Sequence, residues 1–244
     1  MSQCPICLEA GGVSDACDCP ATIHINCLAG YIDKGFAPRC PNCFARVSAS
    51  TLAKASAFLY DQDPCAANLF NLAADLTFSG SPLKALALLD EKATGVGPRF
   101  AFAINVEQAR ALVKMNMPNS ALDALVMAFA DATEETLIPQ CLFAQALMLT
   151  SEAYMGLDKL PLAEAANEVA LKISRCLPLE ERLNILLVTV ELSKRANDIP
   201  KLLAARHHIY DLIKAEEKDP YVVAQVSFFW AGWSLPSPQK REKK

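Results

Sequence analysis

Eight potential metal ligands lie close together at the start of the chain. Seven of the ten cysteines and one of the three histidines fall between Cys4 and Cys43. They form four closely spaced pairs, which are Cys4 with Cys7, Cys17 with Cys19, His24 with Cys27, and Cys40 with Cys43. Structural zinc takes four thiolate or imidazole ligands in a tetrahedron, so eight ligands make two closed zinc sites. Because no position would stay open for water, this pattern argues against a zinc hydrolase.

The distribution of cysteines and of apolar segments indicates the cellular compartment of the protein. Beyond Cys43 there are only Cys65, Cys141 and Cys176, so an extracellular disulfide scaffold is not predicted. The first residues carry neither the basic stretch nor the apolar segment of a secretory signal. The longest uncharged run, 220–239, is too interrupted for a membrane-spanning helix of about 20 residues. We therefore expect a cytoplasmic protein without a transmembrane segment.

The sequence divides into a short part that contains the ligands and a longer part of different composition. Residues 1–48 are too few to bury a stable core, so metal binding should supply most of their folding free energy. Beyond them, alanine and leucine dominate and apolar residues recur at helical spacing, as in Leu179, Leu183, Leu186 and Val190. The sequence therefore predicts a zinc-binding domain over 1–48, an all-α domain over 49–235 and a basic tail over 236–244.

Prolines divide the helical part at similar intervals. Pro82, Pro118, Pro161 and Pro200 recur 36, 43 and 39 residues apart, and alanines follow each of them. Proline is tolerated in the first turn of a helix, where its missing N–H has no intrahelical partner. The pattern predicts helix pairs over 64–94, 98–131, 136–175 and 179–217, with single helices near 49–60 and 220–233. A non-repetitive helical bundle is the alternative.

The order and flanking residues of the ligands resemble a RING finger. Cys4-Pro-Ile-Cys7 is similar to the opening of that domain, and His24-Ile-Asn-Cys27 with Cys40-Pro-Asn-Cys43 is similar to its second half. Four cysteines, one histidine and three cysteines follow the order of the RING-CH variant. The resemblance implies a cross-brace in which Cys4, Cys7, His24 and Cys27 hold one zinc ion. Cys17, Cys19, Cys40 and Cys43 would hold the other.

A PHD finger is the alternative for this module, because the four residues between Cys19 and His24 are closer to its spacing. A PHD finger usually has a tryptophan two residues before the seventh ligand, where this chain has Pro38. Tyr31 and Phe36 are the only aromatic residues between Cys4 and Cys43, so no aromatic cage for methyl-lysine is evident. The RING interpretation is therefore preferred.

The family implies a role in ubiquitin transfer. RING modules recruit a charged ubiquitin-conjugating enzyme and promote transfer without a catalytic residue of their own. The resemblance implies docking through Ile6, through Tyr31 at a position usually held by tryptophan, and through Pro41. Many active RING domains have arginine directly after the last ligand, whereas this chain has Phe44, and the nearest following arginine is Arg46. Phe44 and Arg46 complete the predicted docking residues. We expect a ubiquitin ligase or ligase adaptor, acting in a host cytoplasm if the source lacks a ubiquitin system. A non-enzymatic adaptor or assembly protein is the alternative.

The helix pairs are similar to tetratricopeptide repeats, which have a period of about 34 residues. Such hairpins stack into a solenoid whose concave face binds peptides or helices, and this face would bind the protein substrate. Residues 51–239 carry 16 lysines and arginines against 22 aspartates and glutamates. Nucleic acid is not expected as a partner, because its affinity comes from phosphates neutralised by basic residues.

Some isolated residues suggest further chemistry. Cys65 follows Asp63-Pro64 at a predicted helix N-terminus, a position that can activate a thiol. Isolated helical cysteines are mostly packing residues, however, and we expect this of Cys65, Cys141 and Cys176. His207 and His208 are adjacent on a predicted helix and point in different directions, so they cannot readily share a metal ion.

Phe228, Phe229, Trp230 and Trp233 form an aromatic cluster just before the basic tail. We expect these side chains to pack as part of the core or as a cap on the helices. The alternative is a peripheral membrane contact, because aromatic residues beside lysine and arginine can bind a membrane interface.

Overall fold

The structure is a computed structural model that describes residues 3–12, 16–17, 19–93, 97–132, 138–177 and 179–215. Within these ranges the chain is mostly helical, as predicted, and its β-structure consists of isolated bridge residues, among them the pairs Gln3–Ala10 and Arg39–Arg46. The helices are α1 (Ile25–Asp33), α2 (Ala49–Gln62), α3 (Ala66–Phe78), α4 (Pro82–Lys92), α5 (Pro98–Lys114), α6 (Pro118–Asp131), α7 (Gln140–Gly156), α8 (Leu160–Ile173), α9 (Leu179–Arg195) and α10 (Ile199–Ala215), with a 3-10 turn η1 (Ser174–Cys176) after α8.

Each of the four predicted helix pairs contains two helices, which are α3 with α4, α5 with α6, α7 with α8, and α9 with α10. The single helix predicted near 49–60 is α2. Helices α4, α5 and α6 begin at a proline, as the pattern predicted, because the first helical N–H needs no partner within the helix. The predicted helix near 220–233, the aromatic cluster and the basic tail lie outside the described residues.

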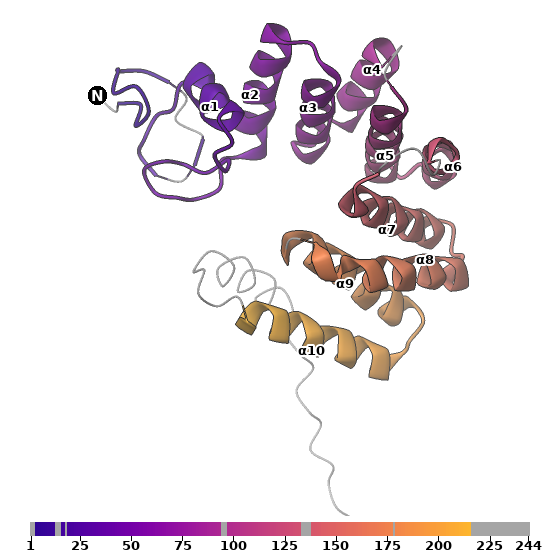
Figure 1. Ribbon diagram of the computed structural model, residues 1–244. Helices are drawn as coiled ribbons and strands as arrows, with labels where there is room; N and C mark the ends of the chain where they lie inside the picture. The colour runs from indigo at the N-terminus through magenta and orange to yellow at the C-terminus, as the bar shows by residue number, and fades with distance from the viewer. Residues whose placement is uncertain are drawn as a thin grey trace, which may run out of the picture.

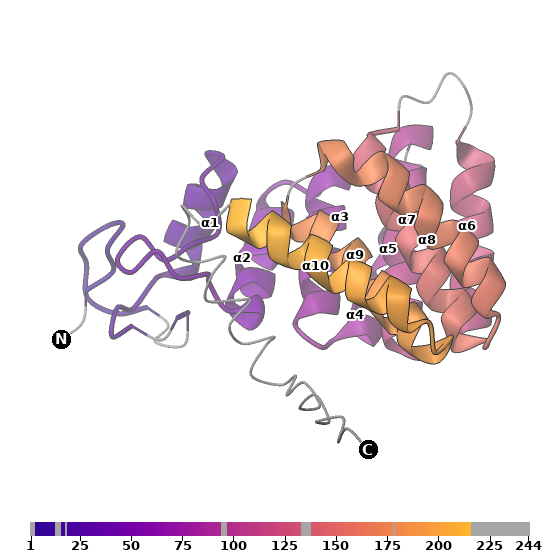
Figure 2. The same cartoon turned by 90° about the horizontal axis from the view of Figure 1, so that it is seen from below.

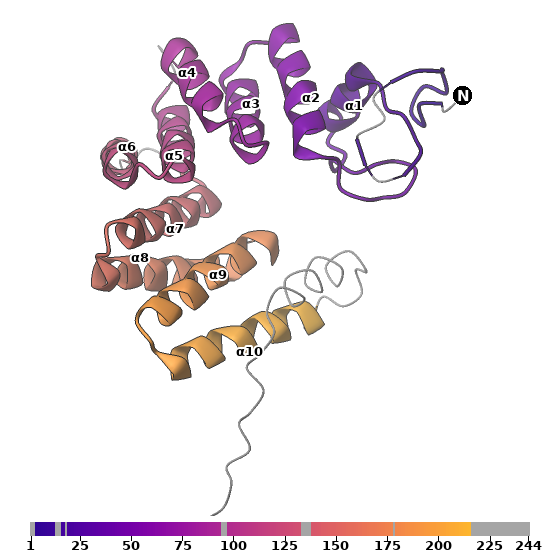
Figure 3. The same ribbon diagram turned by 180° about the vertical axis from the view of Figure 1, so that it is seen from behind.

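The helices follow one another along an open arc (Figure 1). The first helices of successive pairs, α3, α5, α7 and α9, contact one another in sequence. The second helices α4, α6 and α8 each pack against the first helix of the next pair. The same arc is visible from behind (Figure 3), and from below the cysteine-rich segment lies at one edge of the molecule beyond α2 (Figure 2). None of the helices in the described ranges is both long and apolar enough to cross a lipid bilayer.

The four helix pairs share one type of turn. A residue with positive φ lies between the two helices of each pair, namely Gly80 (83°), Asn116 (57°), Asp158 (57°) and Asn197 (54°). Glycine, asparagine and aspartate are the residues that tolerate this left-handed conformation best. The next backbone N–H then reaches back five residues, from Ser81 to Leu76, Met117 to Leu112, Lys159 to Tyr154 and Asp198 to Ser193, at 2.8–2.9 Å. This is the hydrogen bond of a Schellman-type helix end.

The cysteine-rich segment and α2 share one apolar core. Leu28 and Ala29 of α1 and Val47 are buried there together with Ala55 of α2. Leu52, also on α2, packs against the same group. The N-cap of α2 adds a polar link, because the backbone N–H of Ser48 donates to the carbonyl oxygen of Ala16 at 2.7 Å. Helix α2, the first helix of the α-helical part, therefore also contributes to the core of the N-terminal module.

A chain of polar side chains, buried at one end and half-buried at the other, crosses the first helices of three pairs. Glu107 of α5 is fully buried and accepts a hydrogen bond from Arg110 Nε at 2.9 Å. Arg110 Nη2 donates to Gln145 Oε1 of α7 at 2.9 Å, and Gln145 Nε2 donates to Glu181 Oε1 of α9 at 3.2 Å. Burial raises the pKa of Glu107, and the nearby Arg110 opposes that shift. These hydrogen bonds connect α5 to α7 and α7 to α9.

Candidate metal centre

Two similar turns hold the first and last ligand pairs. The N–H of Leu8 donates to the carbonyl of Cys4, and the N–H of Phe44 donates to the carbonyl of Cys40, both at 2.8 Å. Leu8 and Phe44 both have positive φ, at 66° and 58°. Antiparallel bridges close the two turns, between Gln3 and Ala10 and between Arg39 and Arg46. Each Cys-x2-Cys pair is thereby bent so that its two sulfur atoms face the same side.

Helix α1 positions the third ligand pair. His24 is the N-cap of α1, and Cys27 lies in its first turn, so residues three apart project from one face. The loop before it approaches His24 closely. A Cβ at Gly12 would lie 2.7 Å from the Ile23 backbone, and one at Gly11 would lie 3.3 Å from His24 Nε2. Only residues without a side chain fit there, and they leave the Nδ1 side of the ring facing the sulfur atoms.

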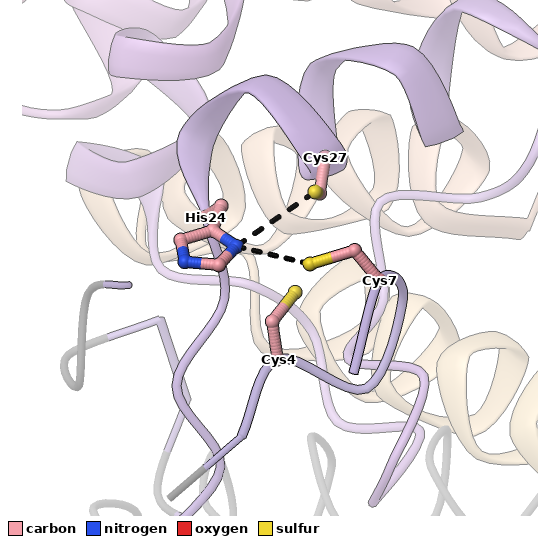
Figure 4. A group of neighbouring side chains, drawn as sticks. All are labelled: Cys4, Cys7, His24 and Cys27. Carbon is pink, nitrogen blue, oxygen red and sulfur yellow. Dashed lines mark hydrogen bonds between the residues drawn. The ribbon is translucent and has the colours of Figure 1, made fainter. Parts of the chain in front are cut away.

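Cys4, Cys7, His24 and Cys27 form the first ligand group, drawn in Figure 4. Their ligand atoms all lie within 4.8 Å of one another. His24 Nδ1 is 3.2 Å from Cys7 Sγ and 3.9 Å from Cys27 Sγ. Zinc bond lengths of about 2.3 Å to sulfur and about 2.0 Å to nitrogen give an N–S edge of about 3.5 Å in a tetrahedron. The two measured edges bracket that value.

Cys17, Cys19, Cys40 and Cys43 form the second ligand group. Cys40 Sγ lies 3.7 Å from Cys19 Sγ, and Cys43 Sγ lies 3.7 Å from Cys17 Sγ. The sulfur–sulfur edge of a zinc tetrahedron is about 3.8 Å, so these two edges fit the ion. Cys17 and Cys19 are closer, at 3.1 Å, and Asn42 Nδ2 donates to Cys19 Sγ at 3.7 Å. The amide is therefore an outer partner of one thiolate ligand.

The thiol pKa values favour one ionised cysteine in each ligand group. Burial raises the pKa of Cys27 to about 12, together with its hydrogen bond to Cys7 and the charge of Cys4. At Cys4, burial is outweighed by backbone hydrogen bonds, from His24 first, which lower the pKa to about 7. In the second group, the hydrogen bond from Cys17 lowers the pKa of Cys19 to about 6, and burial raises that of Cys17. One thiolate forms readily in each group and opposes the next, which a divalent cation would neutralise.

The ligand pairs interleave along the chain. The first and third pairs share one group and the second and fourth share the other, in a cross-brace-like arrangement. This is the pairing that the RING resemblance implied. Each group could hold one zinc ion with four protein ligands, and thiolate with imidazole is a donor set that suits zinc. These are the metal-type groups found in the part of the chain that the structure describes.

The residues predicted for enzyme docking lie on both turns and on α1. Ile6 is half-buried against the N-terminal core. Tyr31 of α1 stacks on Phe36, with ring centroids 4.4 Å apart and an interplanar angle of 13°. Pro41 is half-buried, and Phe44 is 70% exposed. Phe36 itself is 52% exposed, so it extends the aromatic surface of Tyr31. The sequence prediction did not assign Phe36 to docking.

Arg46, the fifth predicted docking residue, is near the helical part of the protein as well as the last ligand pair. Its side chain is exposed, and its charge also lowers the pKa of Asp75 on α3, a carboxyl group whose pKa is raised overall by burial. Ser56 of α2 donates a hydrogen bond to the same carboxylate at 2.6 Å. Arg46 is thus close to the helical part as well as to the second turn.

Leu8 is a surface residue that the sequence prediction missed. It is 70% exposed, like Phe44, and it occupies the same place in the first turn that Phe44 occupies in the last. The signal was present in the sequence, because both residues directly follow the second cysteine of a Cys-x2-Cys pair. The two turns therefore present one large apolar side chain each.

The other residues considered for chemistry lie apart from the metal groups. Cys65 is the N-cap of α3 and is half-buried. Cys141 packs against the core around α7 and α9, and Cys176 lies in η1. His207 and His208 are exposed on α10, and His207 Nδ1 donates to the carbonyl of Leu203 at 2.9 Å.

No protein-family model, no curated protein and no solved structure matches the chain.

Proposed function

We propose that the protein is a RING-type ubiquitin ligase or ligase adaptor, in which a two-zinc module recruits a ubiquitin-conjugating enzyme and the helical hairpins bind the substrate. The observation that carries this proposal is the interleaved pairing of eight ligands into two groups. That arrangement ties the two turns and α1 into one small unit. Zinc would cross-link the chain there and take no part in the chemistry, because every coordination position is filled by protein.

The surface beside the ligand groups supports a recruiting role. Ile6 and Pro41 lie inside the first and last ligand pairs, and the stacked Tyr31 and Phe36 lie at the end of α1. Partly exposed apolar and aromatic side chains on a rigid support are what a docking surface needs. The module would act by holding the charged enzyme in a productive orientation, since it offers no nucleophile of its own.

The helix packing supports a tetratricopeptide-type repeat array. The four pairs share the same left-handed turn, and each pair packs on its neighbours through the first helices. Stacked hairpins of this kind form extended concave surfaces that bind peptides or helices. We propose this surface as the substrate-binding part of the protein.

Autoubiquitination with a panel of conjugating enzymes tests the ligase function. Wild-type protein should form ubiquitin conjugates with at least one enzyme, and Ile6→Ala should reduce the rate at least tenfold, as expected for about 1.4 kcal/mol of lost docking energy. Leu83→Ala, at an exposed position on α4, is the matched control and should retain the wild-type rate. If the wild type carries two zinc ions and stays inert with every enzyme, the ligase function is wrong.

A non-enzymatic adaptor is the second candidate, and Phe44 is the observation that favours it. An exposed phenylalanine stands where many active RING domains have arginine, so the usual charged bridge to ubiquitin is missing. Phe44→Arg separates the two functions. A ligase should gain activity from this substitution, whereas a module that never binds a conjugating enzyme should remain inert. Zinc content must be unchanged in both proteins.

A further inference from the structure

The contact between α6 and α7 is filled by two aromatic rings. Helix α6 packs against α7 as α4 packs against α5 (Figure 1). The rings of Phe129 and Phe143 meet edge to face there, with centroids 5.5 Å apart. Phe129 lies thirteen residues after the left-handed Asn116, and Phe143 lies fifteen residues before the left-handed Asp158. Because every helix pair has such a turn, these spacings identify the same two positions in the other pairs.

Alanine occupies both positions at the contact between α4 and α5. Ala93 lies thirteen residues after the left-handed Gly80, and Ala101 lies fifteen residues before Asn116. Both alanines line a pocket of about 300 Å³ between the two helices, which we call the α4–α5 pocket. At the α8–α9 contact the first position holds Leu171, which packs into a core. The small side chains of the two alanines therefore explain why a pocket lies between the first and second pairs.

The α4–α5 pocket combines an apolar base with a polar rim. Leu89 and Ile104 line it and are 0% and 3% exposed, so an apolar group inserted beside them would leave water. Asp90, Asn105 and Gln108 complete the lining, and Gln108 Nε2 donates to Asp90 Oδ1 at 3.0 Å. Asp90 is exposed, so its carboxylate can also accept a hydrogen bond from a cationic group.

The pocket opens on a different side of α5 from the polar chain. Asn105 and Gln108 each stand two residues before Glu107 and Arg110, which is about 200° around the helix. Arg110 faces the neighbouring first helix, because it donates to Gln145 of α7. An occupant of the pocket therefore leaves the surface along the first helices free. Such a site goes beyond the proposed substrate contact and does not depend on ligase activity.

We propose that the α4–α5 pocket binds a phenylalanine side chain of a partner protein, and that Asp90 pairs with an arginine beside that phenylalanine. The ring takes the place that the protein's own phenylalanines fill at the α6–α7 contact. Aromatic side chains inserted into pockets are common anchors of protein interfaces. The volume of the pocket, at the lower end of the range of about 300–1,000 Å³ for ligand pockets, suits a single ring. The charged pair at the rim then orients the bound segment.

Binding of a short peptide to the full-length protein tests this site. The probe is acetyl-Ala-Phe-Arg-Ala-amide, and the matched peptide has leucine in place of phenylalanine. The phenylalanine peptide should shift the methyl resonances of Leu89 and Ile104 in NMR spectra, because the ring current of a bound ring acts on nearby groups. The leucine peptide should bind at least tenfold more weakly, because it has no ring to fill the pocket.

Filling the pocket from within should abolish binding. The double variant Ala93→Phe with Ala101→Phe copies the two residues of the α6–α7 contact and should remove the peptide-induced shifts. Ala93→Leu copies the α8–α9 contact with less added volume and should weaken the phenylalanine peptide at least tenfold, so it gives the same test if the double variant does not fold. Ala87→Phe, at an exposed position of α4, is the matched control and should bind like the wild type.

The role of Asp90 has its own readout. Asp90→Asn should weaken the arginine peptide about two- to fivefold, as expected for an exposed ion pair. It should not change the affinity of a peptide with glutamine in place of arginine. Equal effects on both peptides would contradict the charged pair.

Five outcomes would overturn the proposal. No shift at Leu89 and Ile104 in the wild type would show that the ring does not enter the pocket, and equal shifts from the leucine peptide would show that it is not recognised. Shifts that persist in a folded double variant would place the probe elsewhere. Phenethylamine bound as tightly as the peptide would make the site one for a small molecule. Methyl resonances that move with protein concentration alone would make a second copy of the chain the occupant.

Discussion

His24 is the one ligand in its group that is not a thiol, and its backbone position explains its suitability. As the N-cap of α1 it has extended φ and ψ values, and the glycine loop leaves its Nδ1 beside three sulfur atoms. At this scale the protein offers two crowded sets of soft donors, and a divalent cation could bind the ionised thiolates of each set.

Replacing one ligand should remove one ion. We expect wild-type protein to bind two zinc ions per chain and Cys7→Ser to bind about one or fewer, because serine is a poor zinc ligand and a three-ligand site would be open to water. Metal analysis after gel filtration gives the stoichiometry. Cys65→Ser is the matched control, because this thiol is the N-cap of α3 and lies outside both groups. Two ions retained by Cys7→Ser would contradict the proposed site.

Glu107 should make stability depend on pH. Its pKa is raised above the ordinary value of 4.5, first by burial, so the folded state binds the proton more tightly than the unfolded state. Wild-type stability should therefore fall as pH rises from about 4.5 through the raised folded pKa. Glu107→Gln keeps an oxygen for Arg110 and removes this dependence.

The difference in the free energy of unfolding between Glu107→Gln and wild type isolates the pH dependence that this carboxyl group causes. The free energy of unfolding of Glu107→Gln, relative to wild type, should rise with pH by about 1.4 kcal/mol for each unit of the upward pKa shift. Urea denaturation across that range measures it, with Glu191→Gln at an exposed ion pair as the control. A difference that is flat with pH would show that the pKa of Glu107 is the same in the folded and unfolded states, so that Arg110 fully offsets the effect of burial.

At the scale of elements, one turn repeated four times organises the helical part. The left-handed residue between the helices is glycine once, asparagine twice and aspartate once, which are the residues that carry this conformation at low cost. The spacing of prolines could predict the pairs, since proline marks helix starts. The left-handed positions could not be assigned beforehand, because asparagine and aspartate also occur in caps and on surfaces.

Gly80→Ala should destabilise the protein by about 1–2 kcal/mol, because alanine strains a backbone with φ of 83°. Gly30→Ala is a matched control within α1. A Cβ meets no atom within 4 Å at either site, so only the backbone conformation distinguishes them. Gly30→Ala should stabilise by about 0.5–1 kcal/mol, because glycine is a poor helix former. Chemical denaturation measures the change in unfolding free energy for each variant. Equal changes would argue against a left-handed conformation at Gly80.

For the whole molecule, the question is how far the metal groups and the helices depend on each other. Ligand identity could be predicted, because zinc ligands are few and closely spaced. The shared core with α2 and the proximity of Arg46 to Asp75 could not, since both join residues far apart in sequence. The hydrogen bonds of Gln145 to Arg110 and to Glu181 could not be predicted either, because their partners are 35 and 36 residues apart.

Removing zinc should therefore loosen α2 as well as the module. With a chelator, amide hydrogen exchange in α1 and α2 should become faster, because Ala55 and Leu52 lose the core against which they pack. Exchange in α7 and α8, which belong to separate cores, should change little. Mass spectrometry of peptic fragments resolves these helices. Full protection of α2 without zinc would show that the module folds independently of it.

In the described part of the chain, the two ends of the arc are connected through successive neighbours, α3 to α5 to α7 to α9, with α4, α6 and α8 each packed against the next first helix. The module and α10 lie at opposite ends of this arc (Figure 1). A small rotation at each helix interface would add to the next, so the separation of the two ends would change much more than any single contact. The protein should behave as a spring of low stiffness. Under the proposed function, the substrate in its curve and the conjugating enzyme at its tip would be brought within reach of each other by elastic bending, without breaking any interface.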